Sequence, residues 1–330
     1  MRKTGGQVAI FGILLASSGH AVSRTVIPAV FEAGHIYATP RLVDGSTIRL
    51  IVDTGGGGAW TYWLGDWSPA AKSLHKLQPC RIGSEDVAQF RIPDFVGPSV
   101  PAPNGPCLGI TIQPRSMEIA SIDGMMGANY LASHGIWTFD YPARQLVLED
   151  RDWVPDRTAR RAALGFHATA IGLRHGFPRL TMIVDGKSIG MLLDTGATAQ
   201  PTLETRAATK QALVNHQGVT SYITKSTFNQ WHRSHPDWIV IEKGDDLFGA
   251  QMTSRVIRVP EIRWAGFSMG PVWFTERADI NFYGQMAEQM DRRPDGALGA
   301  NVFEHLKLTI DYLRDAAWVV CNDRSFCKTE

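Results

Sequence analysis

The sequence has almost no excess charge of either sign. It contains 33 Lys and Arg residues against 32 Asp and Glu residues, a formal net charge of +1 at pH 7. The densest basic cluster, within residues 151–161, is interleaved with aspartates and is typical of a solvated surface. Binding to a nucleic-acid backbone needs a concentrated basic surface. The sequence therefore predicts no nucleic-acid partner.

Cysteine is also scarce, with 4 residues in a chain of 330. The cysteines fall as two local pairs, Cys80 with Cys107 and Cys321 with Cys327. Neither pair has the C-x2-C spacing of a zinc site or a redox motif, and no histidine cluster accompanies them, so no metal is expected. An even number of cysteines in an exported chain suggests disulfides, and four cysteines allow three pairings. We predict the two local disulfides.

The sequence has no hydrophobic run of membrane length. The apolar residues 8–16 near the N-terminus are too few to span a bilayer as a helix. They follow two basic residues and precede Gly19-His20-Ala21, which has the small-x-small pattern of a cleavage site, with Ala21-Val22-Ser23 as an alternative site. Residues 1–23 are therefore predicted to be a signal peptide. The mature chain is expected to be secreted or periplasmic, with no stable membrane span after signal removal.

What the sequence does contain is a long internal duplication. Residues 43–55 and 184–196 align without a gap, and Asp194 lies 141 residues after Asp53. Each segment has a strand-like stretch, an Asp-Gly dipeptide typical of a tight turn, and an apolar stretch ending in Asp-Thr-Gly. A single Asp-Thr-Gly would be weak evidence, whereas two copies in matched segments are not explained by chance.

A second pair of matched blocks follows in the same order. Residues 122–129 and 295–301 both contain Asp-Gly, two apolar residues and Gly-Ala-Asn. Each block leads to a strand-like stretch that ends in Asp-Tyr, at residues 136–141 and 308–312. The repeated order indicates that the whole chain is built from two copies of one unit.

The duplication predicts a mostly β, bilobal fold with two homologous β-barrel-like lobes related by a pseudo-twofold axis. The expected organisation is a first lobe at residues 24–150, a charged linker at 151–165 and a second lobe at 166–330. A helix is predicted from Leu203 to Val214, after Pro201-Thr202.

Equivalent residues near a pseudo-twofold axis meet, so Asp53 and Asp194 are expected to face each other. Two carboxyl groups a few ångströms apart cannot both ionise cheaply, and they share one proton. One site then holds both a general acid and a general base. The two groups titrate as a unit.

Three pairs of equivalent residues are predicted to support the catalytic loops: Thr54 with Thr195, Gly55 with Gly196, and Gly127 with Gly299. The threonine hydroxyls can bond across the lobe interface and hold the loops in register. The first glycine pair permits turns whose amides point at the carboxyl groups. The last pair occupies positions where a second strand passes close to a catalytic loop.

The two Asp-Thr-Gly segments and the later apolar-apolar-Gly segments, Met125–Gly127 and Ala297–Gly299, resemble those of aspartic peptidases of the pepsin and retropepsin type. The Asp-Gly before each later segment looks more like bacterial retropepsin-like proteins than like digestive pepsins. The resemblance implies endopeptidase activity on a peptide or protein substrate, with water activated between Asp53 and Asp194 and no cofactor. It implies no need for a dimer, because one chain carries both aspartates.

The sequence also departs from that family. Where Ser or Ala usually follows Asp-Thr-Gly, Ala197 fits but Gly56 begins a glycine run that offers no hydroxyl to Asp53. A mildly acidic activity optimum is expected for this reason. The flap that closes over substrate in this family is not placed, and Tyr62 and the segment from Cys80 to Cys107 are the candidates.

Other motifs have plainer interpretations. Gly266–Gly270 matches the G-x-S-x-G nucleophile elbow with Ser268, but a strand-like stretch follows it, so a hairpin turn is predicted. His232 and His235 lack a third metal ligand and are expected on the surface. Two alternatives to a peptidase stay open: a non-catalytic peptide-binding module on the same fold, and a serine hydrolase that uses Ser268.

Overall fold

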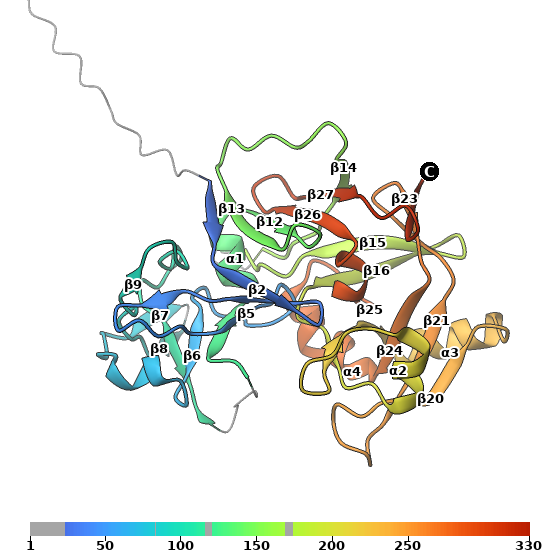
Figure 1. Ribbon diagram of the computed structural model, residues 1–330, viewed down its shortest axis with the longest axis horizontal. Coiled ribbons are helices and arrows are strands. Elements are labelled where there is room, and N and C mark those ends of the chain that lie inside the picture. Colours follow the sequence, from blue (N-terminus) through green and yellow to red (C-terminus); the bar gives the residue numbers. More distant parts are fainter. Residues whose placement is uncertain (1–23, 83, 116–120, 169–173) are drawn as a thin grey trace, which may run out of the picture.

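The computed structural model describes residues 24–330 except 83, 116–120 and 169–173. The predicted signal peptide lies outside the described residues. The described chain is mostly β and bilobal, as the duplication predicts (Figure 1). None of the helices in these residues has the length and hydrophobicity that crossing a bilayer requires.

The first lobe is built on a mixed six-stranded sheet. In spatial order its strands are β10 (Thr111–Gln113), β6 (Trp63–Gly65), β11 (Gly124–Met126), β5 (Leu50–Val52), β3 (His35–Ala38) and β2 (Ala29–Glu32). β3 and β5 form the predicted hairpin, and Gly45 in its turn has a positive φ of 87°. Side chains alternate across the sheet, so Leu50 and Val52 enter the main core while Ile51 packs on the other face.

The second lobe is built on a ten-stranded sheet. In spatial order its strands are β20 (Val240–Asp245), β21 (Ser254–Val259), β24 (Val272–Arg277), β19 (Ser221–Thr224), β25 (Gly296–Gly299), β16 (Lys187–Asp194), β15 (Arg179–Val184), β22 (Ile262–Trp264), β23 (Phe267–Met269) and β28 (Cys327–Thr329). β15 and β16 form the second predicted hairpin. β19 pairs with β24 and β25 in the same directions as β6 pairs with β10 and β11. The shared pairing confirms that the lobes are two copies of one unit.

A third sheet joins the two lobes. Its strands are β1 (Thr25–Ile27), β13 (Gln145–Glu149), β12 (Ile136–Asp140), β26 (Leu306–Asp311), β27 (Ala316–Cys321) and β14 (Arg160–Ala163). β12 and β26 are the equivalent strands of the duplicated blocks, and they pair antiparallel with Thr138 opposite Thr309. The two threonine hydroxyl oxygens lie 2.8 Å apart in a buried position. Because these residues are equivalent in the duplication, the pseudo-twofold axis passes between them.

Short elements complete the lobes. Among the described residues they include β4 (Arg41–Leu42) with β9 (Phe95–Val96), β7 (Cys80–Ile82) with β8 (Glu85–Val87), β17 (Thr198–Ala199) with β18 (Gly218–Val219), α1 (Ala128–His134), α2 (Leu203–Thr209), α3 (Lys225–Ser234), α4 (Asp279–Asn281), α5 (Ala287–Gln289), α6 (Ala300–Phe303), the 3-10 helix η1 (Pro69–Ser73) and the π-helix η3 (Phe282–Met286). The predicted helix from Leu203 ends earlier than expected, because Lys210 adopts a left-handed conformation with a φ of 55°. β14 lies inside the predicted linker, where it pairs with β27.

Both predicted local disulfides are present. One joins Cys80 to Cys107, with a Cα–Cα distance of 5.6 Å, and ties β7 to the loop before β10. The other joins Cys321 to Cys327, with a Cα–Cα distance of 6.4 Å, and links the end of β27 to β28.

Candidate active site

Each candidate catalytic aspartate stands where a central strand of its lobe ends. β5 ends one residue before Asp53, and β16 ends at Asp194. Both strands run parallel to the strand of the later block, with Val52 opposite Met126 and Asp194 opposite Gly299. The Asp53 amide donates to the Met126 carbonyl at 3.0 Å. Two equivalent strand ends therefore carry the two carboxyl groups.

The threonines after the aspartates lock the two loops together. The Thr54 hydroxyl donates to the Leu193 carbonyl at 2.7 Å and accepts from the Thr195 amide at 3.0 Å. The Thr195 hydroxyl donates to the Val52 carbonyl at 2.8 Å and accepts from the Thr54 amide at 3.1 Å. Both threonines are fully buried. The reciprocal bonds fix the position of one loop relative to the other.

The two carboxyl groups meet at the lobe interface, where they are hydrogen-bonded to each other. A Cβ atom built on Gly55 would lie 2.3 Å from Asp194 Cγ, and one built on Gly196 would lie 2.3 Å from Asp53 Cγ. Each loop can therefore approach the opposite carboxyl group only because it carries glycine at this position.

Backbone amides of both loops face the carboxyl groups. The Gly55 amide donates to Asp53 Oδ1 at 2.8 Å, and the Gly196 amide donates to Asp194 Oδ1 at 2.9 Å. The amide of the next residue in each loop also faces its own aspartate and lowers the pKa of that carboxyl group. These donors stabilise a negative charge at the pair.

Burial has the opposite and larger effect. Desolvation raises the pKa of Asp53, and it raises the pKa of Asp194 well above its usual range, where the adjacent Asp53 charge adds to it. Asp194 is 7% exposed. The pair therefore keeps a proton to a higher pH than two isolated carboxyl groups would.

The residue after Asp-Thr-Gly contributes no side-chain hydroxyl in either loop. A Cβ atom built on Gly56 would lie 2.4 Å from Asp53 Oδ2, so a side chain there would require the loop or the carboxyl group to move. The close approach explains why this loop continues with glycine, which the sequence shows only as a departure from the family pattern.

The glycines of the later blocks are also positions of close approach. A Cβ atom on Gly127 would lie 2.6 Å from the Gly57 carbonyl oxygen in the first catalytic loop. One on Gly299 would lie 1.7 Å from the Thr220 carbonyl oxygen and 3.2 Å from Ala197 Cβ. Both glycines occupy the crowded positions predicted for them, although Thr220 is the main neighbour of Gly299.

Sequence analysis did not identify a polar cluster beside the second catalytic loop. The Thr198 amide donates to Tyr222 Oη at 2.8 Å, and the Arg277 guanidinium lies 4.4 Å from the centre of the Tyr222 ring. Arg277 forms a buried ion pair with Asp245 at 2.9 Å. No motif predicts these contacts. The one signal was that Asp245 belongs to a stretch, 216–258, with no first-lobe counterpart of equal length.

The remaining candidates have structural roles. Ser268 lies on β23, which pairs with β22 in a hairpin and is followed by β24, so it does not stand on a strand-to-helix elbow. His235 Nε2 lies 3.1 Å from Asp185 Oδ2, and its ring stacks on Trp238. Within the described residues, no group of three or more His, Cys, Asp or Glu side chains is arranged to hold a metal ion.

Tyr62 is not part of a flap. Its side chain is fully buried in the first-lobe core and packs edge-to-face on Tyr130, with ring centres 5.6 Å apart. A residue that closes over substrate must be able to reach solvent, so this candidate was wrong. The segment from Cys80 to Cys107 stays a prediction.

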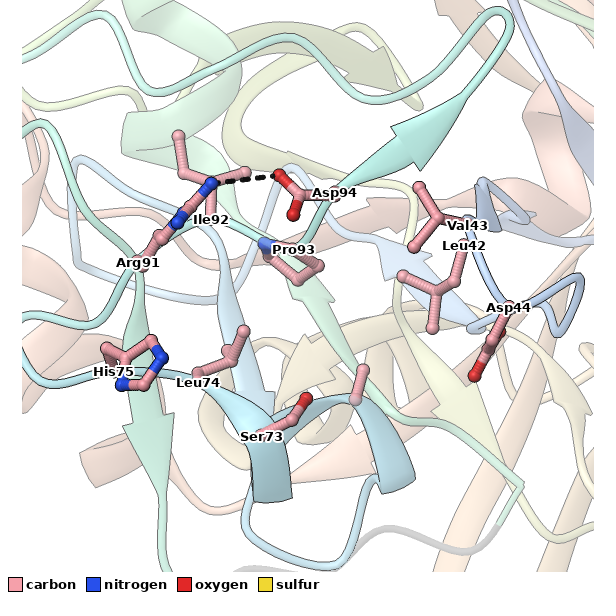
Figure 2. A pocket seen from close by; sticks show the side chains of 11 residues that line it. Leu42, Val43, Asp44, Ser73, Leu74, His75, Arg91, Ile92, Pro93 and Asp94 are labelled. Carbon is pink, nitrogen blue, oxygen red and sulfur yellow. Dashed lines mark hydrogen bonds and ion pairs between the residues drawn. The ribbon is translucent and has the colours of Figure 1, made fainter.

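Two cavities lie at the outer turns of the duplicated hairpins. The first, of about 390 Å³, is bounded by the turn residues Leu42–Asp44 and by the segment 91–94, where Arg91 is ion-paired with Asp94 (Figure 2). The second, of about 310 Å³, lies at Asp185 and Gly186. Neither aspartate of the pair lines these cavities, because each turn is the end of its hairpin opposite to the catalytic loop.

Comparison with known proteins supports the fold. No family model matches the chain, and no curated protein matches it in sequence. Its structure is similar to that of an aspartic proteinase from Irpex lacteus, with a TM-score of 0.51 and 12% identity over 91% of this chain and 98% of the other. A second similar structure is basic 7S globulin from soybean, with a TM-score of 0.46 and 11% identity over 90% and 94% of the two chains. The similarity to the Irpex lacteus structure shows that the chain has the bilobal fold of pepsin-like aspartic proteinases.

Proposed function

We propose that this protein is an aspartic endopeptidase in which Asp53 and Asp194 activate a water molecule. The observation that carries the proposal is the hydrogen-bonded carboxyl pair at the ends of two equivalent strands. The threonine bonds between the loops hold this pair in a fixed geometry, which proton transfer requires. The similarity in fold to an aspartic proteinase agrees with the same chemistry.

Because burial raises the pKa of both carboxyl groups, the pair keeps one proton and supplies one base and one acid. In the proposed reaction Asp53 is the ionised base and removes a proton from water. The water oxygen bonds to the peptide carbonyl carbon while Asp194 gives its proton to the carbonyl oxygen. The tetrahedral diol then breaks its C–N bond, as Asp53 passes its proton to the leaving nitrogen and Asp194 recovers a proton from a diol hydroxyl. The chain supplies both acid and base, so this route uses no metal, cofactor or covalent intermediate.

The proposed substrate, oligomeric state and cellular location follow from the same observations. The substrate is a peptide or protein, and a monomer suffices because both carboxyl groups come from one chain. The two disulfides fit a secreted or periplasmic protein. The bacterial retropepsin-like subtype is supported only by the Asp-Gly dipeptides of the later blocks and stays a prediction.

The test is cleavage of a denatured protein substrate by the mature chain from about pH 3 to about pH 8. We expect activity with a mildly acidic optimum that a statine-type inhibitor blocks. Asp53→Asn and Asp194→Asn should each reduce activity by about a hundredfold or more, because each removes a proton-transfer group. The exposed Asp66 provides the matched control, since Asp66→Asn makes the same change away from the site.

Two outcomes would contradict this proposal, and a third would contradict only the expected pH optimum. Cleavage that survives both dyad substitutions and is lost in Ser268→Ala would support the serine hydrolase. Binding of peptides and of the inhibitor without cleavage at any pH would support the non-catalytic module. An optimum below about pH 3 would contradict the expectation of mild acidity.

A further inference from the structure

The hairpin formed by β2 and β3 reaches from the first lobe into the second (Figure 1). Its turn contains Ala33 and Gly34, both with a positive φ. A Cβ atom on Gly34 would lie 2.4 Å from Val219 Cγ2 in β18, so the turn is pressed against the second lobe. The residue that follows this turn, His35, is 4% exposed.

His35 makes a hydrogen bond to the second lobe. Its Nε2 atom lies 2.8 Å from the Thr198 hydroxyl oxygen. The Thr198 hydroxyl donates its own proton to the Gly196 carbonyl at 2.8 Å, so it accepts from His35 Nε2–H. This direction of donation assigns the neutral imidazole its Nε2–H tautomer.

The Gly196 carbonyl belongs to the peptide group whose amide faces the catalytic pair. That amide is the N–H of Ala197, which points at the Asp194 carboxyl group. Holding the carbonyl at one end of a planar peptide fixes the direction of the N–H at the other end. A continuous series of contacts therefore runs from His35 through Thr198 and this peptide group to Asp194.

We propose that His35 is a positioning residue for the second catalytic loop, which it holds from the first lobe through Thr198. The inference rests on the proposed peptidase activity and goes beyond it by assigning a residue that belongs to neither Asp-Thr-Gly segment. His35 touches neither aspartate, and it acts on the geometry of the peptide group beside Asp194.

The first catalytic loop carries no hydroxyl side chain at the position equivalent to Thr198, so it cannot form the same contact. The residue 141 positions before Thr198 is Gly57, which has no side chain to hold a carbonyl. The duplicated site is thus made asymmetric by contacts outside the duplicated motifs.

The contact is also sensitive to acid. Burial, together with the smaller effect of the nearby Arg49 charge, lowers the pKa of His35 to about 4. Arg49 is itself paired with Glu32 and stacked on the Tyr37 ring, while on the second-lobe side Arg277 reaches the Thr198 carbonyl at 3.4 Å. A protonated imidazole would be a buried cation near these two arginines, so acid is expected to release the hairpin and weaken the hold on the loop.

The experiment compares His35→Gln, which keeps a donor but does not titrate, with His35→Leu, which removes the donor. The Leu variant should lower kcat on the order of tenfold near neutral pH, with a nearly unchanged KM, because the Asp194 carboxyl group is displaced while substrate still binds. The deficit should shrink towards about pH 4, where protonation of His35 weakens the same contact in the wild type. The Gln variant should keep most of kcat and extend activity to lower pH than the wild type. A Leu variant with wild-type kcat and pH profile would overturn the proposal, as would a Gln variant no better than Leu.

A stability measurement tests the contact between His35 and Thr198 independently of any enzyme assay. Denaturant unfolding of His35→Leu, Thr198→Val and the double variant gives a coupling energy, which the proposal requires to be favourable at about pH 7 and smaller at about pH 4. No coupling would overturn the proposal even if the enzyme is active. An inactive wild type with strong, pH-dependent coupling would instead refute the peptidase function while leaving the His35 contact in place.

Discussion

The carboxyl group of Asp194 is held at a cost to the stability of the fold. Because burial and the Asp53 charge raise its pKa, the folded chain keeps this proton more tightly than the unfolded chain does. From about pH 4 upward, until the folded pKa is passed, the free energy of unfolding therefore falls as pH rises. Asp194→Asn removes the ionisation, so we expect it to be inactive yet more stable than the wild type at neutral pH.

Thermal and urea unfolding at several pH values checks this prediction. The advantage of Asp194→Asn should be largest near neutral pH and should disappear below about pH 3, where the wild-type carboxyl group is protonated in both the folded and the unfolded state. Asp66→Asn, at an exposed position, should show no comparable gain. A variant that is less stable than the wild type by the same amount at every pH would contradict the prediction. It would mean that ionisation of Asp194 does not destabilise the folded chain.

At the scale of elements, the two catalytic loops depend on each other through their threonines. Thr54→Val keeps the shape of the side chain but leaves the buried Leu193 carbonyl and Thr195 amide without a partner. The expected cost is about 1–3 kcal/mol of unfolding free energy, with a fall in kcat. Thr54→Ser keeps the hydroxyl and should lose less of both. The exposed Thr47 is the matched control, and equal costs for Thr54→Val and Thr47→Val in urea unfolding would contradict the role assigned to the loops.

The same elements show how far the sequence could predict the structure. Both hairpins, the Asp-Thr-Gly loops and the crowded glycines could be predicted, because residues repeated in two copies must occupy equivalent positions. The contact of His35 with Thr198 could not, because it joins residues 163 positions apart that have no repeated partner. Local signals also missed the left-handed Lys210 that ends α2 and the pairing that makes a strand of β14, since tertiary contacts decide both.

For the whole molecule, the pseudo-twofold axis is intramolecular. It passes between Thr138 and Thr309 in the sheet that joins the lobes, and between the threonines of the two catalytic loops. Each lobe contributes one carboxyl group to a single site, and residues of both lobes are shared in one core. Both carboxyl groups therefore come from one chain, and we expect activity without a dimer, whereas a site at the axis of a dimer would depend on protein concentration.

This arrangement predicts that defects in the two halves cannot complement each other. If Asp53→Asn and Asp194→Asn proteins are unfolded together, refolded together and assayed, every chain still carries one amide in its only site, and activity should not return. The wild type treated alone in the same way is the control for refolding, and its specific activity should stay constant over about a hundredfold dilution. Recovery of about a quarter of wild-type activity from the mixture would show that lobes exchange between chains, because random pairing of lobes then restores some intact pairs. That result would move the active site from the monomer to an assembly of two chains.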